Sequence, residues 1–185
     1  MPLGSHTPEV DAIRAVPDLV GPDLRLLFVG INPSIMSAET GFHFAHPVNR
    51  FYPALRAAGI LPADVMRPAE AAPVLVARSV GITNLVQRAS VRADELDDDE
   101  LRAGRMRLER FVGQHRPRVI AVAGITAFRT AFGERRARLG RQAASIGDAE
   151  LWVVPNPSGL NAHATIATLA AAYREVAFAA GLVLQ

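Results

Sequence analysis

The sequence contains no cysteine and no lysine among its 185 residues. Without cysteine, the chain cannot form disulfides, thiolate zinc sites or cysteine-ligated iron–sulfur clusters. All 20 of its basic residues are arginine, so no side-chain amine is present to form a Schiff base with an aldehyde. Only the N-terminal amine could take that role, and chemistry through a lysine imine is therefore excluded.

Long apolar runs and a strong charge of one sign are also missing. No segment approaches the roughly 20 apolar residues of a membrane-spanning helix, and we expect no secretory signal. The formal net charge is only +2, which by itself gives no strong nucleic-acid signal. Charge is nevertheless uneven, because residues 94–100 are acidic and residues 102–141 strongly basic. The basic stretch either contacts phosphates or forms the solvated face of an amphipathic helix.

Apolar runs alternate with helical patterns along the chain. The expected strands are residues 24–29, 79–86, 118–123 and 151–154, and the expected helices are residues 47–58, 69–77, 97–114, 124–132 and 165–180. This order predicts one α/β domain over residues 10–185, a three-layer α/β/α fold with a short, mostly parallel central sheet, after a tail at residues 1–9. Ligands bind such sheets at the carboxyl ends of the strands.

Two segments at those strand ends carry an Asn-Pro step. Gly30-Ile-Asn-Pro-Ser34 follows the first expected strand, and Asn156-Pro-Ser-Gly-Leu160 follows the fourth. Proline restricts the preceding asparagine and makes a rigid turn, which holds one carboxamide in a fixed direction. A single Asn-Pro is most simply a turn signal, whereas two at equivalent strand ends indicate a paired site.

Together with Gly41-Phe-His-Phe-Ala-His-Pro-Val-Asn-Arg-Phe51, these segments resemble the mismatch-specific uracil-DNA glycosylases. Those enzymes belong with the thymine-DNA glycosylases in the wider uracil-DNA glycosylase superfamily. The resemblance runs from about Leu24 to about Arg174. It implies a monofunctional DNA-repair enzyme that flips uracil, thymine or another damaged base out of mismatched double-stranded DNA. Hydrolysis of the N-glycosidic bond would then leave an abasic site.

The resemblance also assigns roles to residues of a base pocket. Asn32 would hold and polarise the attacking water; a carboxamide takes up no proton at neutral pH, so a slow enzyme is expected. Phe44 would stack on the extruded base, although a core position is the alternative. Asn84 either lines the pocket or caps a turn. The expected pocket residues are Ile31, Ser37, Phe44, Asn84 and Asn156.

The segment after the fourth expected strand is predicted to contact the DNA. By the resemblance, Leu160 is an apolar wedge that fills the gap left by the flipped base, and neighbouring backbone groups read the orphaned guanine. The predicted DNA-binding residues are Ser158, Gly159, Leu160, Asn161 and His163. From the residues alone, Leu160 could be ordinary loop packing and His163 could cap the last helix.

Three positions bear on how far the resemblance holds. Ser34 stands where the family commonly has glycine, and Ala162 where its best-known members carry arginine. Asp94 is a second candidate for catalysis, because a carboxylate is a better general base than a carboxamide. The alternative is that Asp94 and its acidic neighbours cap the helix that starts near Asp97.

Other functions remain open at this point. The chain could bind damaged DNA without turnover, or it could hydrolyse free nucleosides; a free nucleoside leaves no gap for Leu160 to fill. His43 and His46 are too few for a metal site, and we expect no metal and no organic cofactor. We expect a monomer in the cytoplasm, a bacterial-type cytosol, with the chromosome.

Overall fold

The computed structural model describes residues 15–185, so the tail predicted at residues 1–9 lies outside the described part. The strands are β1 (Leu26–Gly30), β2 (Val80–Asn84), β3 (Val119–Ala123), β4 (Gly140–Ile146) and β5 (Ala149–Val154). The α-helices are α1 (Ile35–Thr40), α2 (Phe51–Ala57), α3 (Pro68–Ala77), α4 (Asp98–His115), α5 (Ile125–Phe132) and α6 (Ile166–Ala179). A single 3-10 turn, η1 (Ala93–Glu95), precedes α4.

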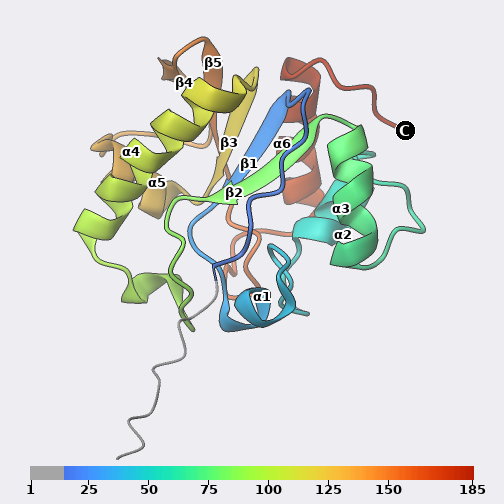
Figure 1. Ribbon diagram of the computed structural model, residues 1–185, viewed down its shortest axis with the longest axis horizontal. Helices are drawn as coiled ribbons and strands as arrows, with labels where there is room; N and C mark the ends of the chain where they lie inside the picture. The colour runs from blue at the N-terminus through green and yellow to red at the C-terminus, as the bar shows by residue number, and fades with distance from the viewer. Residues whose placement is uncertain (1–14) are drawn as a thin grey trace, which may run out of the picture.

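The strands form one sheet in the order β2-β1-β3-β5-β4. β1 pairs in parallel with β2 and β3, and β3 pairs in parallel with β5. β4 is antiparallel to β5 at one edge (Figure 1). The predicted α/β fold with a short, mostly parallel sheet is confirmed. Among the described residues, no helix is long and apolar enough to span a membrane.

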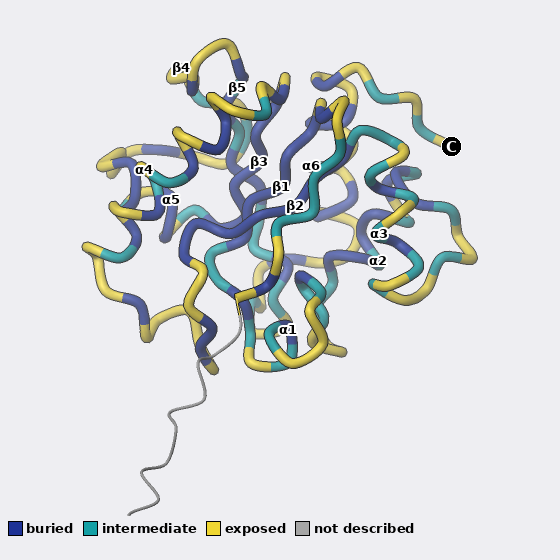
Figure 2. Tube along the Cα trace, viewed as in Figure 1, coloured by how far each residue is buried: buried dark blue, intermediate teal, exposed yellow. Residues whose placement is uncertain are grey.

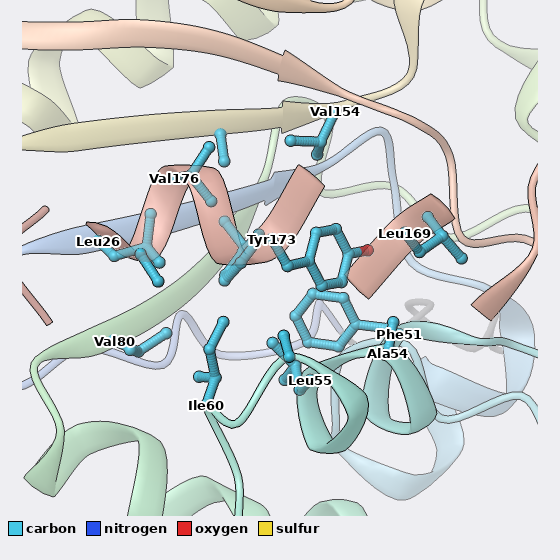
Figure 3. Packing of buried hydrophobic residues seen from close by; sticks show 14 of the residues in the cluster. Leu26, Phe51, Ala54, Leu55, Ile60, Val80, Val154, Leu169, Tyr173 and Val176 are labelled. Atoms are coloured by element: carbon cyan, nitrogen blue, oxygen red, sulfur yellow. The ribbon is translucent and has the colours of Figure 1, made fainter. Parts of the chain in front are cut away.

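Helices cover both faces of the sheet, and three of its parallel strands are buried along their whole length. Every residue of β1, β2 and β3 is buried, as expected of parallel strands between two helical layers (Figure 2). One core cluster joins the sheet to α2, α3 and α6, and a second joins it to α4 and α5. In the first cluster, the rings of Phe51 and Tyr173 lie side by side between α2 and α6 (Figure 3).

One strand, one α-helix and the 3-10 turn η1 were not predicted, and one helix begins later than expected. β4 was missed because its residues are mostly exposed and form no apolar run; its pairing with β5 holds it in the sheet. The strand expected fourth is therefore β5. The short helix α1 was also missed. The helix expected from residue 47 begins at Phe51, because residues 46–49 form a turn in which His46 O accepts from Asn49 N.

Backbone pairing continues beyond the carboxyl end of β1 and positions the site. The residues after β2 donate to those after β1: Leu85 N to Gly30 O at 2.9 Å, and Ser90 N to Pro33 O at 3.1 Å. The loop of residues 85–97 therefore runs beside the first Asn-Pro segment. This contact brings together residues that are far apart in the sequence.

Candidate active site

The carboxamide of Asn32 is held in one orientation by the loop after β2. Its Nδ2 donates to the carbonyl oxygen of Arg88 at 2.9 Å and to Ser90 Oγ at 2.7 Å. Ser90 Oγ in turn donates its hydrogen to the Arg92 carbonyl at 2.6 Å, so it can only accept from Asn32. Both amide hydrogens are thereby used, and Oδ1 is left to accept a hydrogen bond from a water.

The same loop is fixed to the start of α4 by an ion pair. The Arg88 guanidinium donates to both carboxylate oxygens of Glu100, at 2.7 and 2.9 Å. These hydrogen bonds lower the pKa of Glu100 to about 2. Glu100 also accepts from the backbone of Asp97, whose side chain caps α4, which confirms the predicted capping role of Asp97. The orientation of Asn32 thus depends on a chain of contacts that ends in a helix cap.

Two predicted pocket residues, Asn84 and Phe44, pack closely against the backbone of Gly30. A methyl group at Gly30 would overlap Asn84 Oδ1 and would come within 3.1 Å of the Phe44 ring. The Phe44 ring is stacked on Phe51 with centroids 4.1 Å apart, and it is half-buried, unlike the fully buried Phe51. Phe44 has φ 54°, a strained conformation for a bulky residue. Strained backbone conformations of this kind cluster at functional sites.

Asn84 is oriented by His43 rather than used as a turn cap. Its Nδ2 lies 3.1 Å from His43 Nδ1, and His43 Nε2 lies 2.9 Å from the Pro17 carbonyl. Because Pro17 O can only accept, Nε2 carries the proton and Nδ1 accepts from Asn84. Burial lowers the pKa of His43, which favours this neutral form. Within the described part of the chain, Asn84 Oδ1 and one amide hydrogen have no hydrogen-bond partner, so they could bind a ligand.

Ser34 and Ser37 build the turn that follows Asn32. Ser34 Oγ caps α1 by accepting from Ser37 N at 3.1 Å, so the departure from glycine adds a helix cap. Ser37 is buried, and its Oγ accepts from Ser34 Oγ at 3.0 Å and from Ala45 N at 3.2 Å. Ser37 therefore ties α1 to the segment that carries Phe44.

Ile31 and Asn156 both lie close to Gly124, the residue that follows β3. Gly124 has φ 130°, a conformation that favours glycine, and a methyl group on it would lie 3.2 Å from Ile31 and 3.8 Å from Asn156. Asn156 Oδ1 accepts from Ser158 N at 3.0 Å, which makes a local turn. The two Asn-Pro segments are thus brought to the same edge of the sheet.

We call residues 156–164 the wedge loop. Asn161 braces it by donating from Nδ2 to the Asn156 carbonyl at 2.9 Å. The Leu160 side chain is not packed against the core: Leu160 is 79% exposed. His163 is exposed and does not cap α6, since Thr165 fills that position. The alternatives of loop packing for Leu160 and helix capping for His163 were therefore wrong.

Asp94 lies on η1 with its side chain largely exposed. Its carboxylate pairs with the Arg92 guanidinium at 2.6 Å, and the cap of α4 is Asp97. Among residues 15–185, Asp94 is connected to the Asn32 site through Arg92, whose carbonyl oxygen accepts from Ser90 Oγ. Ala162 is exposed on the wedge loop and supplies no charge there.

Sequence reasoning missed three supporting residues. Ser90 and Arg88 stand in no recognisable motif, because they orient Asn32 through one hydroxyl group and one backbone carbonyl. Arg50 stands within the quoted motif, and its guanidinium donates into the wedge loop. Among the described residues, no group of three or more His, Asp or Glu could hold a metal ion.

The chain matches the model of a known protein family. The family model described as the uracil DNA glycosylase superfamily matches residues 17–177, which is most of the chain. The chain therefore belongs to the uracil DNA glycosylase superfamily. Membership supports a DNA glycosylase role with DNA as the substrate.

The fold has a counterpart among solved structures. The solution NMR structure of a candidate uracil DNA glycosylase from Methanosarcina acetivorans superposes with a TM-score of 0.61. The identity is 17%, and the match covers 89% of this chain and 98% of that one. At this identity the likeness shows the shared fold.

Proposed function

We propose that the protein is a monofunctional glycosylase that removes uracil, and related bases such as thymine, from mismatched double-stranded DNA. The observation that carries the proposal is the Asn32 carboxamide: both amide hydrogens are bound by the protein, and its oxygen accepts no hydrogen bond from residues 15–185. An oxygen aimed in this way can orient one water toward the sugar carbon. We further propose that the protein acts as a monomer in the cytosol, without metal or cofactor.

The reaction follows from what a carboxamide can do. Water adds its oxygen to C1′ of the sugar as the bond from C1′ to the base nitrogen breaks. The bonding electrons leave with the base, which later takes up a proton. Asn32 accepts a hydrogen bond from the water but cannot remove its proton at neutral pH, so cleavage depends on departure of the base. Slow turnover is the consequence.

The pocket next to Asn32 has the groups to recognise a pyrimidine. Phe44 packs one face on Phe51, and we propose that a flipped base stacks on its other face. Asn84 would offer its Oδ1 and its free amide hydrogen to the edge of that base. Base–aromatic stacking contributes roughly 1–3 kcal/mol and tolerates different bases, so a substrate range wider than uracil is expected.

The wedge loop supplies what a duplex substrate requires. A base that leaves the helix leaves a gap, and the exposed Leu160 is placed to fill it. We propose that Gly159 and Asn161 read the opposite base and that Ser158 and His163 contact phosphate. Because the chain has no lysine, the reaction should stop at the abasic site.

Single-turnover release of base from a duplex with one U·G mismatch tests the proposal. U·A, T·G and single-stranded uracil substrates are run in parallel, with wild type and Asn32→Ala. Gln142→Ala on β4 is the matched control, because this carboxamide likewise makes two hydrogen bonds through its amide nitrogen, to the carbonyls of Arg138 and Gly140, but lies outside the site. We expect U·G to be preferred and Asn32→Ala to lose an order of magnitude or more.

The other outcomes separate the alternatives. Release that survives Asn32→Ala would move the chemistry to another residue. Tight binding of U·G duplex without release would indicate a damaged-DNA binding module, and release from free deoxyuridine but not from DNA would indicate a nucleoside hydrolase.

A further inference from the structure

Arg50 directs its guanidinium into the wedge loop. It donates to the carbonyl oxygens of Ser158, Asn161 and Ala164, with the Asn161 distance at 2.8 Å. Its own backbone N–H donates to the Pro157 carbonyl at 3.0 Å. One residue therefore bonds to four peptide units of a loop that has no strand or helix of its own.

The hydrogen bonds within the loop are local and join residues no more than five positions apart, whereas Arg50 joins the loop to the segment before α2. Asn161 N donates to Ser158 O at 3.0 Å, and the side chains of Asn156 and Asn161 close two local turns. The carbonyls of Ser158 and Asn161 face inward, toward the guanidinium, and Leu160 between them is turned outward. Without the Arg50 guanidinium, the carbonyls of Ser158 and Asn161 on either side of Leu160 would lose the donor that they share.

Contacts next to Arg50 allow the loop little room. A methyl group at Gly159 would lie 2.9 Å from Val48 O and 2.7 Å from its side chain, so the two backbones are in close approach. Beneath the guanidinium lies Tyr173, whose hydroxyl is buried. Burial raises the pKa of Tyr173, and the nearby positive charge of Arg50 opposes that rise.

The charge of Arg50 is directed toward backbone oxygens rather than a carboxylate. Within residues 15–185, its side-chain partners are three carbonyls, and no acidic side chain forms an ion pair with it. A planar guanidinium suits this task because its donors diverge in fixed directions. A lysine ammonium would be a point donor on a flexible stem and could not span the same three oxygens equally well.

We infer that Arg50 is the positioning residue of the wedge loop and sets where Leu160 meets the DNA. Phe51, the next residue, is the ring on which Phe44 stacks. The proposed base platform and the proposed wedge are therefore connected to adjacent residues of one turn. This arrangement fixes the distance between the flipped base and the gap it leaves. The inference rests on the proposed function for its consequence in DNA, but not for the loop contact itself.

The first test is independent of enzyme activity. Chymotrypsin cleaves after exposed leucine, and Leu160 in the wedge loop is such a site, so cleavage at the Leu160–Asn161 bond reports how well the loop is held. We expect Arg50→Met to raise the cleavage rate by about tenfold or more, since several charge-assisted hydrogen bonds are lost. Arg50→Lys should give an intermediate rate. Unchanged cleavage in Arg50→Met would overturn the inference.

The matched control is Arg56→Met in the same helix. Arg56 also donates to a backbone carbonyl, that of Val65 at 3.2 Å, but it does not touch the wedge loop. Its cleavage at Leu160 should equal that of wild type. Far-UV circular dichroism and the melting temperature show whether each variant is folded. If Arg50→Met does not fold, the Arg50→Lys comparison decides, and wild-type cleavage rates in that variant overturn the inference.

The second test uses base release. Arg50→Met should reduce single-turnover release from a U·G duplex about tenfold, with a much smaller further loss in a Leu160→Ala background, because both changes remove the same wedge. If Arg50→Met reduced the rate of base release equally in the wild-type and Leu160→Ala backgrounds, this would contradict the inference that Arg50 acts by positioning Leu160. If wild type releases no base from any substrate, the proposed function fails, while the proteolysis result still decides the role of Arg50.

Discussion

Ser90→Ala would remove one of the two contacts that orient Asn32 while leaving Asn32 in place. The lost hydrogen bond runs from Asn32 Nδ2 to Ser90 Oγ at 2.7 Å; the second, to the Arg88 carbonyl at 2.9 Å, remains. A neutral hydrogen bond contributes about 0.5–1.5 kcal/mol. If that energy serves to aim the carboxamide, base release should slow by about 2- to 10-fold, since 1.36 kcal/mol corresponds to a factor of ten.

The assay is single-turnover release from a U·G duplex, measured for Ser90→Ala in wild-type and Asn32→Ala backgrounds. In the second background the serine has no carboxamide to hold, so its removal should have no further effect. Ser145→Ala is the control, because Ser145 Oγ also donates to a backbone carbonyl, that of Gly147, on the distant strand β4. Equal losses in both backgrounds, or no loss at all, would refute the reasoning that orientation is what Asn32 contributes.

Three further predictions concern the pocket and its surroundings. Gly30→Ala should displace Asn84 and Phe44, reduce base release about tenfold or more and lower the melting temperature, because the added methyl group overlaps Asn84 Oδ1 and crowds the Phe44 ring; a fully active variant with an unchanged melting temperature would contradict this prediction. Since burial lowers the pKa of His43, its neutral form stabilises the fold above the ordinary histidine pKa of about 6.5, and this stability is lost as the pH falls below that value toward the lowered pKa of the folded state. The melting temperature of wild type should therefore fall more between pH 7.5 and 5.5 than that of His43→Gln, and parallel curves would argue against it. Asp94→Ala should leave single-turnover release within about twofold, because an exposed ion pair contributes little; a tenfold loss would restore Asp94 as a catalytic candidate.

Much of the fold could be predicted because the central strands are buried on both faces. Apolar runs ending at Gly30, Ala123 and Val154 located β1, β3 and β5, and the acids near Asp97 located the start of α4. β4 escaped because an edge strand with exposed residues carries no such run. Its place is determined by pairing with β5, which is information that lies outside its own seven residues.

The candidate site was predictable where a residue acts through its own side chain. Asn32, Phe44 and Leu160 stand in motifs with distinct chemistry, and the structure places them at one edge of the sheet or in the loop beside it. Ser90 was not predictable, because it lies 58 positions from Asn32 and acts through one hydroxyl in an irregular loop. His43 was considered only as a metal ligand, although its contact with Asn84, 41 positions away, orients the pocket.

A site that relies on a carboxamide places an unusual demand on its supports. A catalytic carboxylate contributes both an orientation and a proton acceptor, whereas Asn32 has only its orientation to contribute. Changes to the residues that hold Asn32 should therefore lower the rate for every substrate by a similar factor. Changes at Asn84 or Phe44 should instead alter the ratio between substrates, since these groups face the base. Measuring each variant on both U·G and T·G duplexes therefore separates the two kinds of residue. An equal rate loss on both substrates indicates a residue that orients the water, and a changed ratio of rates indicates a residue that contacts the base.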